Sequence, residues 1–399
     1  MTGHKRIRFA AGFLAAAFFL QNFVAPAAEA QGIGRRAQRA LQKVIEEKEA
    51  PFAAAILMEA KTGQIIFEQD SQKPWPPASL TKMMLMLIAI EKVKQGALSM
   101  TDAVEVSARA SKMGGSQVYL KQGEKFSVED LMRAIVIHSA NDASEAIAER
   151  IAGDADAFVV IMNQRAQELG LKTTKYYNAH GLPPERGQQS DVTSAYDTAL
   201  LARELVKHPE VLKWSSTVKE PFRDGKFLLE NTNHLVGKFP GADGLKTGYY
   251  SDAGFNVAAT AHREGLRFIA VILGSPSNKI RFREASKLLT MGYSEYKMLT
   301  FMKPGEAVPQ EIRIKGGQIK SLHAVAGSPA QVLVKRVDEK AVKSSIQLAG
   351  PVWAPLKKGD KLGEITLMLG DKPVGKFNLV ADKDIEQSNF IWRLWDRVF

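Results

Sequence analysis

The chain of 399 residues contains no cysteine, which excludes disulfide bonds, thiolate catalysis and zinc sites with cysteine ligands. Its seven histidines include no His-Glu-x-x-His motif and no pair at helical spacing, so the sequence supports neither a metal site nor another cofactor. The net charge is +11, but lysine and arginine are scattered rather than gathered in a basic stripe. The sequence therefore argues against a nucleic-acid partner and favours an acidic surface or polymer.

The apolar run near the N-terminus is too short to span a bilayer comfortably. It covers twelve residues, from Phe9 to Leu20. A basic stretch precedes it, and small residues ending in Ala28-Glu29-Ala30 follow it. These are the three parts of a cleavable secretory signal, so residues 1–30 are predicted to be a signal peptide. An uncleaved anchor is the alternative, and both interpretations send the remaining chain across the membrane to the periplasmic face.

The chain as a whole has the composition of a globular protein, with 45% hydrophobic and 24% charged residues. Mixed helical and strand patterns over residues 51–300 predict an α+β domain, preceded by a charged lead-in at residues 31–50. Short alternating segments with Gly and Pro over residues 301–384 predict a small β-sandwich domain. The boundary is expected near 301–304. The chain shows no internal repeat.

Periodicity places the expected elements of the α+β domain. An apolar stretch without Gly or Pro predicts a buried helix from Ser79 to about Val93. Other helices are expected over 131–138, 143–151, 155–169, 194–207 and 281–291, and strands over 53–58, 64–67, 255–259 and 268–273.

The last segment, residues 385–399, is predicted to be an amphipathic helix. Aromatic and aliphatic side chains from Phe390 to Phe399 cover one arc, and Arg393, Asp396 and Arg397 fall on the other side. This pattern is typical of a helix that lies in the plane of a membrane surface. A terminal helix docked on its own protein would show a similar stripe.

Ser79-Leu80-Thr81-Lys82 places a hydroxyl and an amine at a spacing suited to acyl transfer. Residues three apart on a helix are neighbours, and a desolvated lysine loses its proton easily. Lys82 would then act as a base for a nucleophilic Ser79. The same spacing occurs at residues 216–219 and 294–297, but neither copy begins a strongly apolar helix.

Two later segments add candidate residues for the same acyl-transfer site. Ser139-Ala140-Asn141 is the one Ser-x-Asn sequence in the chain and interrupts two predicted helices. Lys246-Thr247-Gly248 begins the strand-rich stretch, where Gly248 would let a substrate approach the backbone. A second Lys-Thr-Gly at 61–63 precedes the nucleophile and fits a hairpin turn.

The three motifs, in this order, resemble those of the penicillin-binding protein and serine β-lactamase superfamily. Within it the chain is similar to the low-molecular-mass D-alanyl-D-alanine carboxypeptidases over essentially its whole mature length. The segments that carry the similarity are 77–84, 141–144, 180–182, 243–248 and 284–289. The resemblance implies an antiparallel sheet flanked by helices, a helical subdomain, a trailing β domain and an amphipathic tail.

The resemblance also implies roles. Ser79 would attack the bond between two D-alanines of a peptidoglycan stem peptide and would be acylated by β-lactams, with Lys82 as its base. Ser139 would relay a proton to the leaving amine, and Asn141 would hold Lys82 and the substrate amide. Lys246 and Thr247, beside Gly248, would bind near the terminal carboxylate.

Backbone N–H groups of Ser79 and Tyr249 would form the oxyanion hole. Arg281 would support carboxylate recognition, with Arg283 nearly as well placed. Tyr249 departs from the histidine that several members carry after Lys-Thr-Gly. His180 and Asp197 align with positions linked to deacylation, where a structural role is at least as well supported.

Several alternatives share part of this pattern. A peptidoglycan endopeptidase would carry the same three motifs. A class A β-lactamase would need a Glu-x-x-Leu-Asn loop, and residues 176–190 offer only Pro184-Glu185-Arg186-Gly187. A non-enzymatic wall-binding protein would have no need to keep the four reactive side chains, which are those of Ser79, Lys82, Ser139 and Lys246.

Overall fold

The structure is a computed structural model that describes residues 51–389. The predicted signal peptide at 1–30, the lead-in at 31–50 and the tail residues 390–399 lie outside the described residues. Within the described part, no helix combines the length and the apolar character needed to cross a membrane.

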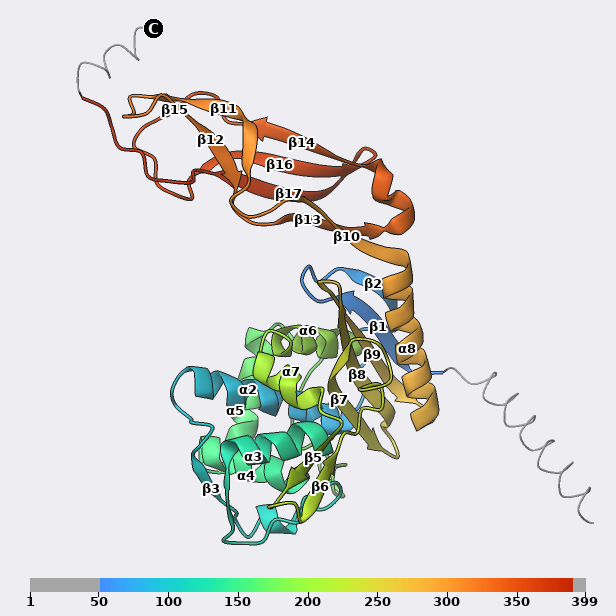
Figure 1. Cartoon of the computed structure of the whole chain (residues 1–399). Coiled ribbons are helices and arrows are strands. Elements are labelled where there is room, and N and C mark those ends of the chain that lie inside the picture. Colours follow the sequence, from blue (N-terminus) through green and yellow to red (C-terminus); the bar gives the residue numbers. More distant parts are fainter. Residues whose placement is uncertain (1–50, 390–399) are drawn as a thin grey trace, which may run out of the picture. The chain divides into compact units, whose positions relative to one another are not determined.

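A five-stranded antiparallel sheet forms the centre of the first domain, as predicted (Figure 1). Its strand order is β2-β1-β9-β8-β7, so β7 is an edge strand. The strands are β1 (Ala54–Glu59), β2 (Ile65–Gln69), β7 (Ala242–Tyr250), β8 (Gly254–Arg263) and β9 (Leu266–Ser275). The Lys61-Thr62-Gly63 segment forms the turn between β1 and β2, in agreement with its structural interpretation.

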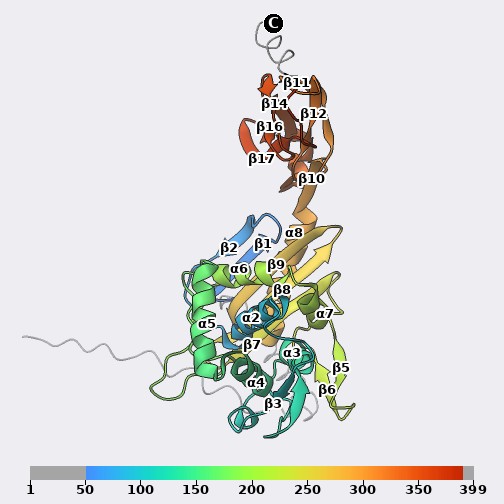
Figure 2. The same cartoon turned by 90° about the vertical axis from the view of Figure 1, so that its left-hand side faces the viewer.

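Both faces of this sheet are covered, which explains the unbroken apolar runs at residues 54–58 of β1 and 268–273 of β9. Ile56 and Met58 of β1 pack into the core shared with α2, whereas Ala55 and Leu57 pack into the core shared with α8. Successive side chains of a strand point to opposite faces, so a strand between two helical layers needs no polar side. Figure 1 shows α8 on one side of the sheet, and Figure 2 looks onto the side covered by α2 and α6.

Helices surround the sheet and form a subdomain beside it. They are α2 (Lys82–Lys94), α3 (Val128–Arg133), α4 (Asn141–Ala152), α5 (Ala155–Glu168), α6 (Ala195–Leu205), α7 (Pro209–Ser215) and α8 (Asn278–Glu295). Short 3₁₀ turns cover η1 (Ala78–Thr81) and η2 (Ala110–Lys112), and η3 (Ala134–His138) is a π-helical turn. Two hairpins complete the domain: β3 (Ala103–Glu105) with β4 (Lys125–Ser127), and β5 (Lys219–Phe222) with β6 (Phe227–Glu230).

The second domain is built of strands around its own apolar core, as predicted, and contains one short 3₁₀ turn that was not predicted. A six-stranded sheet has the order β14-β16-β17-β12-β11-β15, and β10 pairs with β13. The elements are β10 (Tyr296–Met302), β11 (Ala307–Lys315), β12 (Ser321–Ala326), β13 (Ala330–Lys335), η4 (Arg336–Ala341), β14 (Val342–Leu348), β15 (Val352–Trp353), β16 (Lys361–Leu369) and β17 (Lys372–Val380). Strand β10 starts directly after α8, a few residues before the expected boundary at 301.

The tail prediction needs one correction. Residues 385–389 are not helical: Ile385 is 3% exposed and forms a β-bridge with Leu356, and Gln387 forms one with Gly317. A buried apolar side chain and main-chain pairing tie these residues to the β domain. A C-terminal helix therefore cannot begin at residue 385, and the amphipathic pattern that starts at Phe390 lies outside the described residues.

Candidate active site

Ser79 and Lys82 are brought together where the chain enters the buried helix. Ser79 lies in the turn η1 and Lys82 is the first residue of α2, so the predicted helix begins as a 3₁₀ turn. The Nζ atom of Lys82 lies 3.0 Å from Oγ of Ser79. Ser79 is only half-buried, whereas Lys82 is completely buried. The hydroxyl is therefore open to a substrate while the amine beside it is shielded from water.

The surroundings of Lys82 favour a neutral amine. Burial lowers its pKa well below the usual value, and the charge of Lys246 lowers the pKa further. Nζ also contacts Oδ1 of Asn141, at 2.6 Å, and the main-chain carbonyl of His180. These two oxygens can only accept, so they can take both N–H bonds of a neutral amine. The lone pair is then left for the hydroxyl proton of Ser79.

Ser139 and Lys246 form a second hydroxyl–amine pair in the same site. Ser139 follows η3 in a left-handed conformation with φ of 67°, which is unusual for a residue other than glycine and turns the chain between η3 and α4. Lys246 donates from Nζ to Oγ of Ser139 at 2.8 Å. Burial lowers the pKa of Lys246 to about 7, and the charge of Arg281 contributes. The loop turn and the edge strand thus meet through these two side chains.

The Lys-Thr-Gly segment lies on the edge strand β7, directly against η1. A side chain at Gly248 would place its Cβ 2.5 Å from the carbonyl oxygen of Pro77 and 3.0 Å from the nitrogen of Ser79. Glycine is needed here for the close approach of β7 to Ser79. Thr247 donates from Oγ1 to Oγ1 of Thr232 at 2.7 Å.

The side chain of Arg281, on α8, contacts the main chain of β7. Its Nη1 donates to the carbonyls of Gly248, at 3.1 Å, and Asn256, at 2.9 Å. Burial lowers its pKa to about 10. Arg283 instead donates from Nε to Glu284. Of the two arginines, Arg281 is the one in contact with the Lys-Thr-Gly strand.

Known proteins match both domains. The family model of D-alanyl-D-alanine carboxypeptidases matches residues 42–277, and that of the C-terminal domain of penicillin-binding protein 5 matches residues 296–387. The chain belongs to the D-alanyl-D-alanine carboxypeptidase family. Among curated relatives, D-alanyl-D-alanine carboxypeptidase DacF of Bacillus subtilis is 36% identical, over 85% of this chain and 87% of its own length. DacC of Escherichia coli is 33% identical, over 90% of each chain.

Solved structures agree with this membership. Penicillin-binding protein 5 from Haemophilus influenzae is 30% identical, with a TM-score of 0.74 over 85% of this chain and 98% of that one. Penicillin-binding protein D2 from Listeria monocytogenes, in its ampicillin-bound form, is 32% identical, with a TM-score of 0.56 over 61% and 98% of the chains. This chain is thus a serine-type carboxypeptidase of the penicillin-binding class.

Two positions that the sequence left open have defined surroundings in this carboxypeptidase. Tyr249 is 56% exposed and its ring stacks on Phe255, with centroids 4.1 Å apart. Asp197 is buried, and its Oδ2 accepts from the main-chain N–H of Thr173 and from Oγ1 of Thr174, both at 2.8 Å. These contacts hold Asp197 to the start of the loop that follows α5.

His180 lies beside Lys82, but its ring faces elsewhere. Its Nδ1 accepts from the main-chain N–H of Leu182 at 3.1 Å, and its Nε2 lies 4.0 Å from Oε2 of Glu145. Burial lowers its pKa to about 3, and the charges of Lys82 and Arg109 contribute. The ring is therefore neutral at physiological pH.

Two buried acids near the carboxypeptidase site were missed by the sequence reasoning. Asp191 accepts from Oγ1 of Thr81 at 2.7 Å, and burial raises its pKa to about 6. Glu145 lies on α4, one turn after Asn141. No motif singles out either residue. Glu145 falls at position i+4 from Asn141, the spacing that puts two helical residues on one face, and that spacing is the available signal.

The two other Ser-x-x-Lys copies are structural. Ser216 donates to the carbonyl of Lys213, and Ser294 donates to that of Met291. Such bonds to the preceding turn are ordinary at helix ends.

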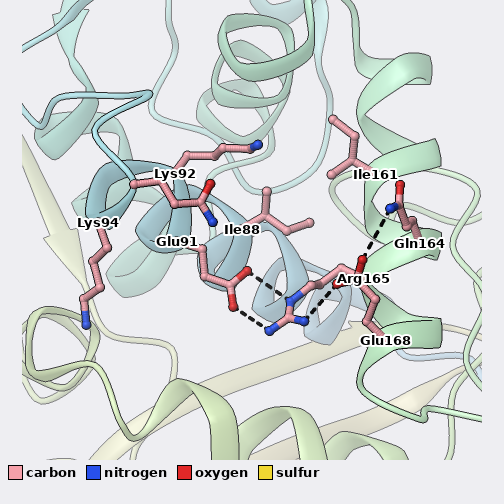
Figure 3. Close-up of a pocket in the computed structure, with 9 residues that line it drawn as sticks. Ile88, Glu91, Lys92, Lys94, Ile161, Gln164, Arg165 and Glu168 are labelled. Atoms are coloured by element: carbon pink, nitrogen blue, oxygen red, sulfur yellow. Dashed lines mark hydrogen bonds and ion pairs between the residues drawn. The ribbon is translucent and has the colours of Figure 1, made fainter.

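Two cavities flank the helices. One of about 580 Å³ lies beside the site and is lined by residues that include Arg109, Tyr177, His180 and Leu182. The other, of about 540 Å³, lies between the C-terminal half of α2 and α5, where Arg165 pairs with Glu91 and Glu168 (Figure 3). Among the described residues, none of the motif side chains lines this second cavity.

Proposed function

We propose that this exported carboxypeptidase removes the terminal D-alanine from peptidoglycan pentapeptides through an acyl-enzyme at Ser79. The observation that carries the proposal is the 3.0 Å contact between the Ser79 hydroxyl and the buried amine of Lys82. A serine hydroxyl is a weak nucleophile at its ordinary pKa and needs an adjacent base.

Acylation begins with proton transfer. Lys82 takes the proton of Ser79, and Oγ bonds to the carbonyl carbon of the penultimate D-alanine. The developing oxyanion accepts from the backbone N–H groups of Ser79 and Tyr249. The closeness of Gly248 to the Ser79 nitrogen supports this pairing, since it places the next residue of β7 beside the same carbonyl.

The peptide bond then breaks and the leaving amine must gain a proton. Ser139 relays the proton held on Lys82 to that nitrogen, and free D-alanine departs. The 2.8 Å contact between Lys246 and Ser139 supports a relay role, because the cation can stabilise a transient charge on the hydroxyl oxygen.

Binding of the substrate relies on its terminal carboxylate. Lys246 and Thr247 hold the carboxylate from β7, and Arg281 adds a positive charge behind the strand. Asn141 binds the substrate amide. Water then attacks the ester carbonyl while the amine of Lys82 takes a proton from the water. The bond to Oγ of Ser79 breaks, Lys82 returns the proton to Oγ, and the shortened peptide leaves with a new carboxyl group.

β-Lactams would acylate the same serine. The ampicillin-bound form described for the Listeria monocytogenes protein supports this extension. The amphipathic pattern from Phe390 to Phe399 supports peripheral attachment to the periplasmic face of the membrane.

One assay tests the central proposal. The full mature chain is incubated with a peptide ending in D-Ala-D-Ala, and released D-alanine is measured with and without penicillin. We expect release that penicillin blocks. A protein that releases no D-alanine would be a binding protein, and one that hydrolyses penicillin rapidly would be a β-lactamase.

A further inference from the structure

Glu145 is a fully buried acid whose neighbours are ionisable groups. Its Oε1 lies 2.6 Å from Nε of Arg109, and its Oε2 lies 4.0 Å from Nε2 of His180. Among the described residues, neither oxygen takes part in a hydrogen bond of regular geometry. Burying a carboxyl group costs free energy unless it is well paired. A buried acid with so little compensation calls for a functional explanation.

Arg109 connects Glu145 to the segment that orients Asn141. This segment, residues 107–118, runs along α4. Its carbonyl at Gly114 accepts from Nδ2 of Asn141 at 2.7 Å, and its carbonyl at Ser116 accepts from the main-chain N–H of Asn141, also at 2.7 Å. Because Nδ2 is fixed on Gly114, the opposite atom, Oδ1, must face Lys82. The Glu145–Arg109 pair therefore helps to hold one acceptor of the lysine amine.

His180 connects Glu145 to the other acceptor. Its Nδ1 accepts a main-chain N–H, so the proton of the neutral ring is on Nε2, which faces Glu145. The carbonyl of the same residue accepts from Nζ of Lys82. His180 therefore faces both groups: its ring lies toward Glu145, and its carbonyl accepts from Lys82.

We propose that Glu145 is a positioning residue for acyl transfer, because it supports both oxygens that orient the Lys82 amine toward Ser79. It touches neither the nucleophile nor the substrate. The inference rests on the proposed function of Ser79 and Lys82 and identifies what holds that pair in its reactive arrangement.

The ionisable groups around Glu145 come from four elements. Arg109 and His180 lie on loops, Glu149 on the same helix and Asp156 on α5. Burial raises the pKa of Glu145 to about 7, with Glu149 and Asp156 adding to the effect and Arg109 opposing it. An ionised Glu145 therefore lowers the free energy of unfolding at alkaline pH. A neutral replacement is expected to retain or raise stability while it weakens the support of Lys82.

The decisive comparison is Glu145→Gln with Glu149→Gln in the full mature chain. Glu149 lies one turn further along α4 and accepts from Oγ of Ser107 at 2.9 Å, so it contacts the same segment away from Lys82. Acylation by a fluorescent penicillin, kcat and KM for D-alanine release, and the unfolding temperature are measured at pH 8. We expect acylation and kcat to fall about tenfold or more in Glu145→Gln, with little change in KM, because small misplacements of reacting groups are costly.

The control should stay within about twofold of the parent chain, since the half-buried carboxylate of Glu149 bonds to Ser107 and to neither oxygen that orients Lys82. Arg109→Gln should reproduce the defect, and the double variant should be no slower than the slower single variant, because the two residues act as one unit. This second variant keeps the test intact if Glu145→Gln does not fold.

Two results would overturn the proposal. One is a folded Glu145→Gln that acylates at the parental rate. The other is equal losses in Glu145→Gln and Glu149→Gln that follow their unfolding temperatures, which would indicate a merely structural helix face. Failure of the proposed function is a separate outcome, because the parent chain itself would then show no labelling at Ser79.

Discussion

Lys82 and Lys246 are both completely buried, and the positive charge of Lys246 adds to burial in lowering the pKa of Lys82. Two ammonium groups in one dry site repel each other, so one of them gives up its proton more readily. Each lysine contacts a different serine hydroxyl: Lys82 contacts Ser79, and Lys246 contacts Ser139. In the proposed function, this asymmetry would supply one base, Lys82, and one cation, Lys246, from the same residue type.

The buried charge of Lys246 should appear as a pH-dependent cost in stability. Its pKa is about 7 in the folded chain, against about 10.5 for an ordinary lysine. Between these values the unfolded chain binds more protons, so the contribution of this lysine to folding becomes less unfavourable as pH rises. We expect the unfolding temperature of Lys246→Met to exceed that of the parent most at pH 7 and to lose this advantage toward pH 10. Scanning fluorimetry across this range checks it; a difference that does not vary with pH contradicts it.

The nucleophile and base can be separated by two substitutions. Ser79→Ala should abolish covalent labelling by fluorescent penicillin, because it removes the hydroxyl that contacts Lys82, whereas the hydroxyl of Ser139 contacts Lys246 instead. Lys82→Arg should reduce labelling by about a hundredfold or more, since a guanidinium stays protonated and cannot accept the serine proton. Labelling that survives Ser79→Ala, measured on denaturing gels with folding checked by circular dichroism, would identify a different nucleophile.

Gly248→Ala tests the closeness of β7 to the nucleophile. The added Cβ would lie 2.5 Å from the carbonyl of Pro77 and 3.0 Å from the nitrogen of Ser79, so main chain must shift. We expect acylation to fall at least about tenfold, because displacement of the oxyanion donors is costly. Gly350→Ala is the matched control, since its Cβ would meet nothing within 4 Å. Parental acylation in Gly248→Ala would show that the strand can move without consequence.

Truncation tests the tail. Removing residues 390–399 should release the protein from membranes and leave D-alanine release unchanged in solution, because the apolar arc begins at Phe390. A cut at 385 is a poorer test, since Ile385 is buried against the β domain and its loss would destabilise that domain. Sedimentation with vesicles gives the answer. Full retention of the shortened chain would assign attachment to another part of the molecule.

Local patterns in the sequence were sufficient to predict much of this architecture. The buried helix at 79–93 and the strands on either side of the 61–63 turn were expected from periodicity and are confirmed, with boundaries shifted by a few residues. Helix α7 and the hairpin of β5 and β6 were not expected, because the segments are short and β5 contains Pro221. The π-helical turn before Ser139 was also unforeseen, since ordinary helical periodicity fits the same residues.

The candidate site likewise contains residues that the sequence predicted and residues that it missed. The three motifs carry their chemistry in short spacings, and the structure brings Ser79, Lys82, Ser139 and Lys246 together. Asp191 has no such spacing, because its contact with Thr81 joins segments 110 residues apart. Side chains that support the reacting groups from a distant part of the chain leave no local pattern and become visible only when the chain is folded.

The position of β7 at the border of its sheet has a consequence for selectivity. A strand at a sheet border offers main-chain donors and acceptors to an added extended chain, whatever side chains that chain carries. A peptide aligned there would be held mostly by atoms common to all peptides. In the proposed function, discrimination would then fall on the C-terminal end of the ligand, where Lys246 would bind a free carboxylate, and variation further along the ligand would be tolerated.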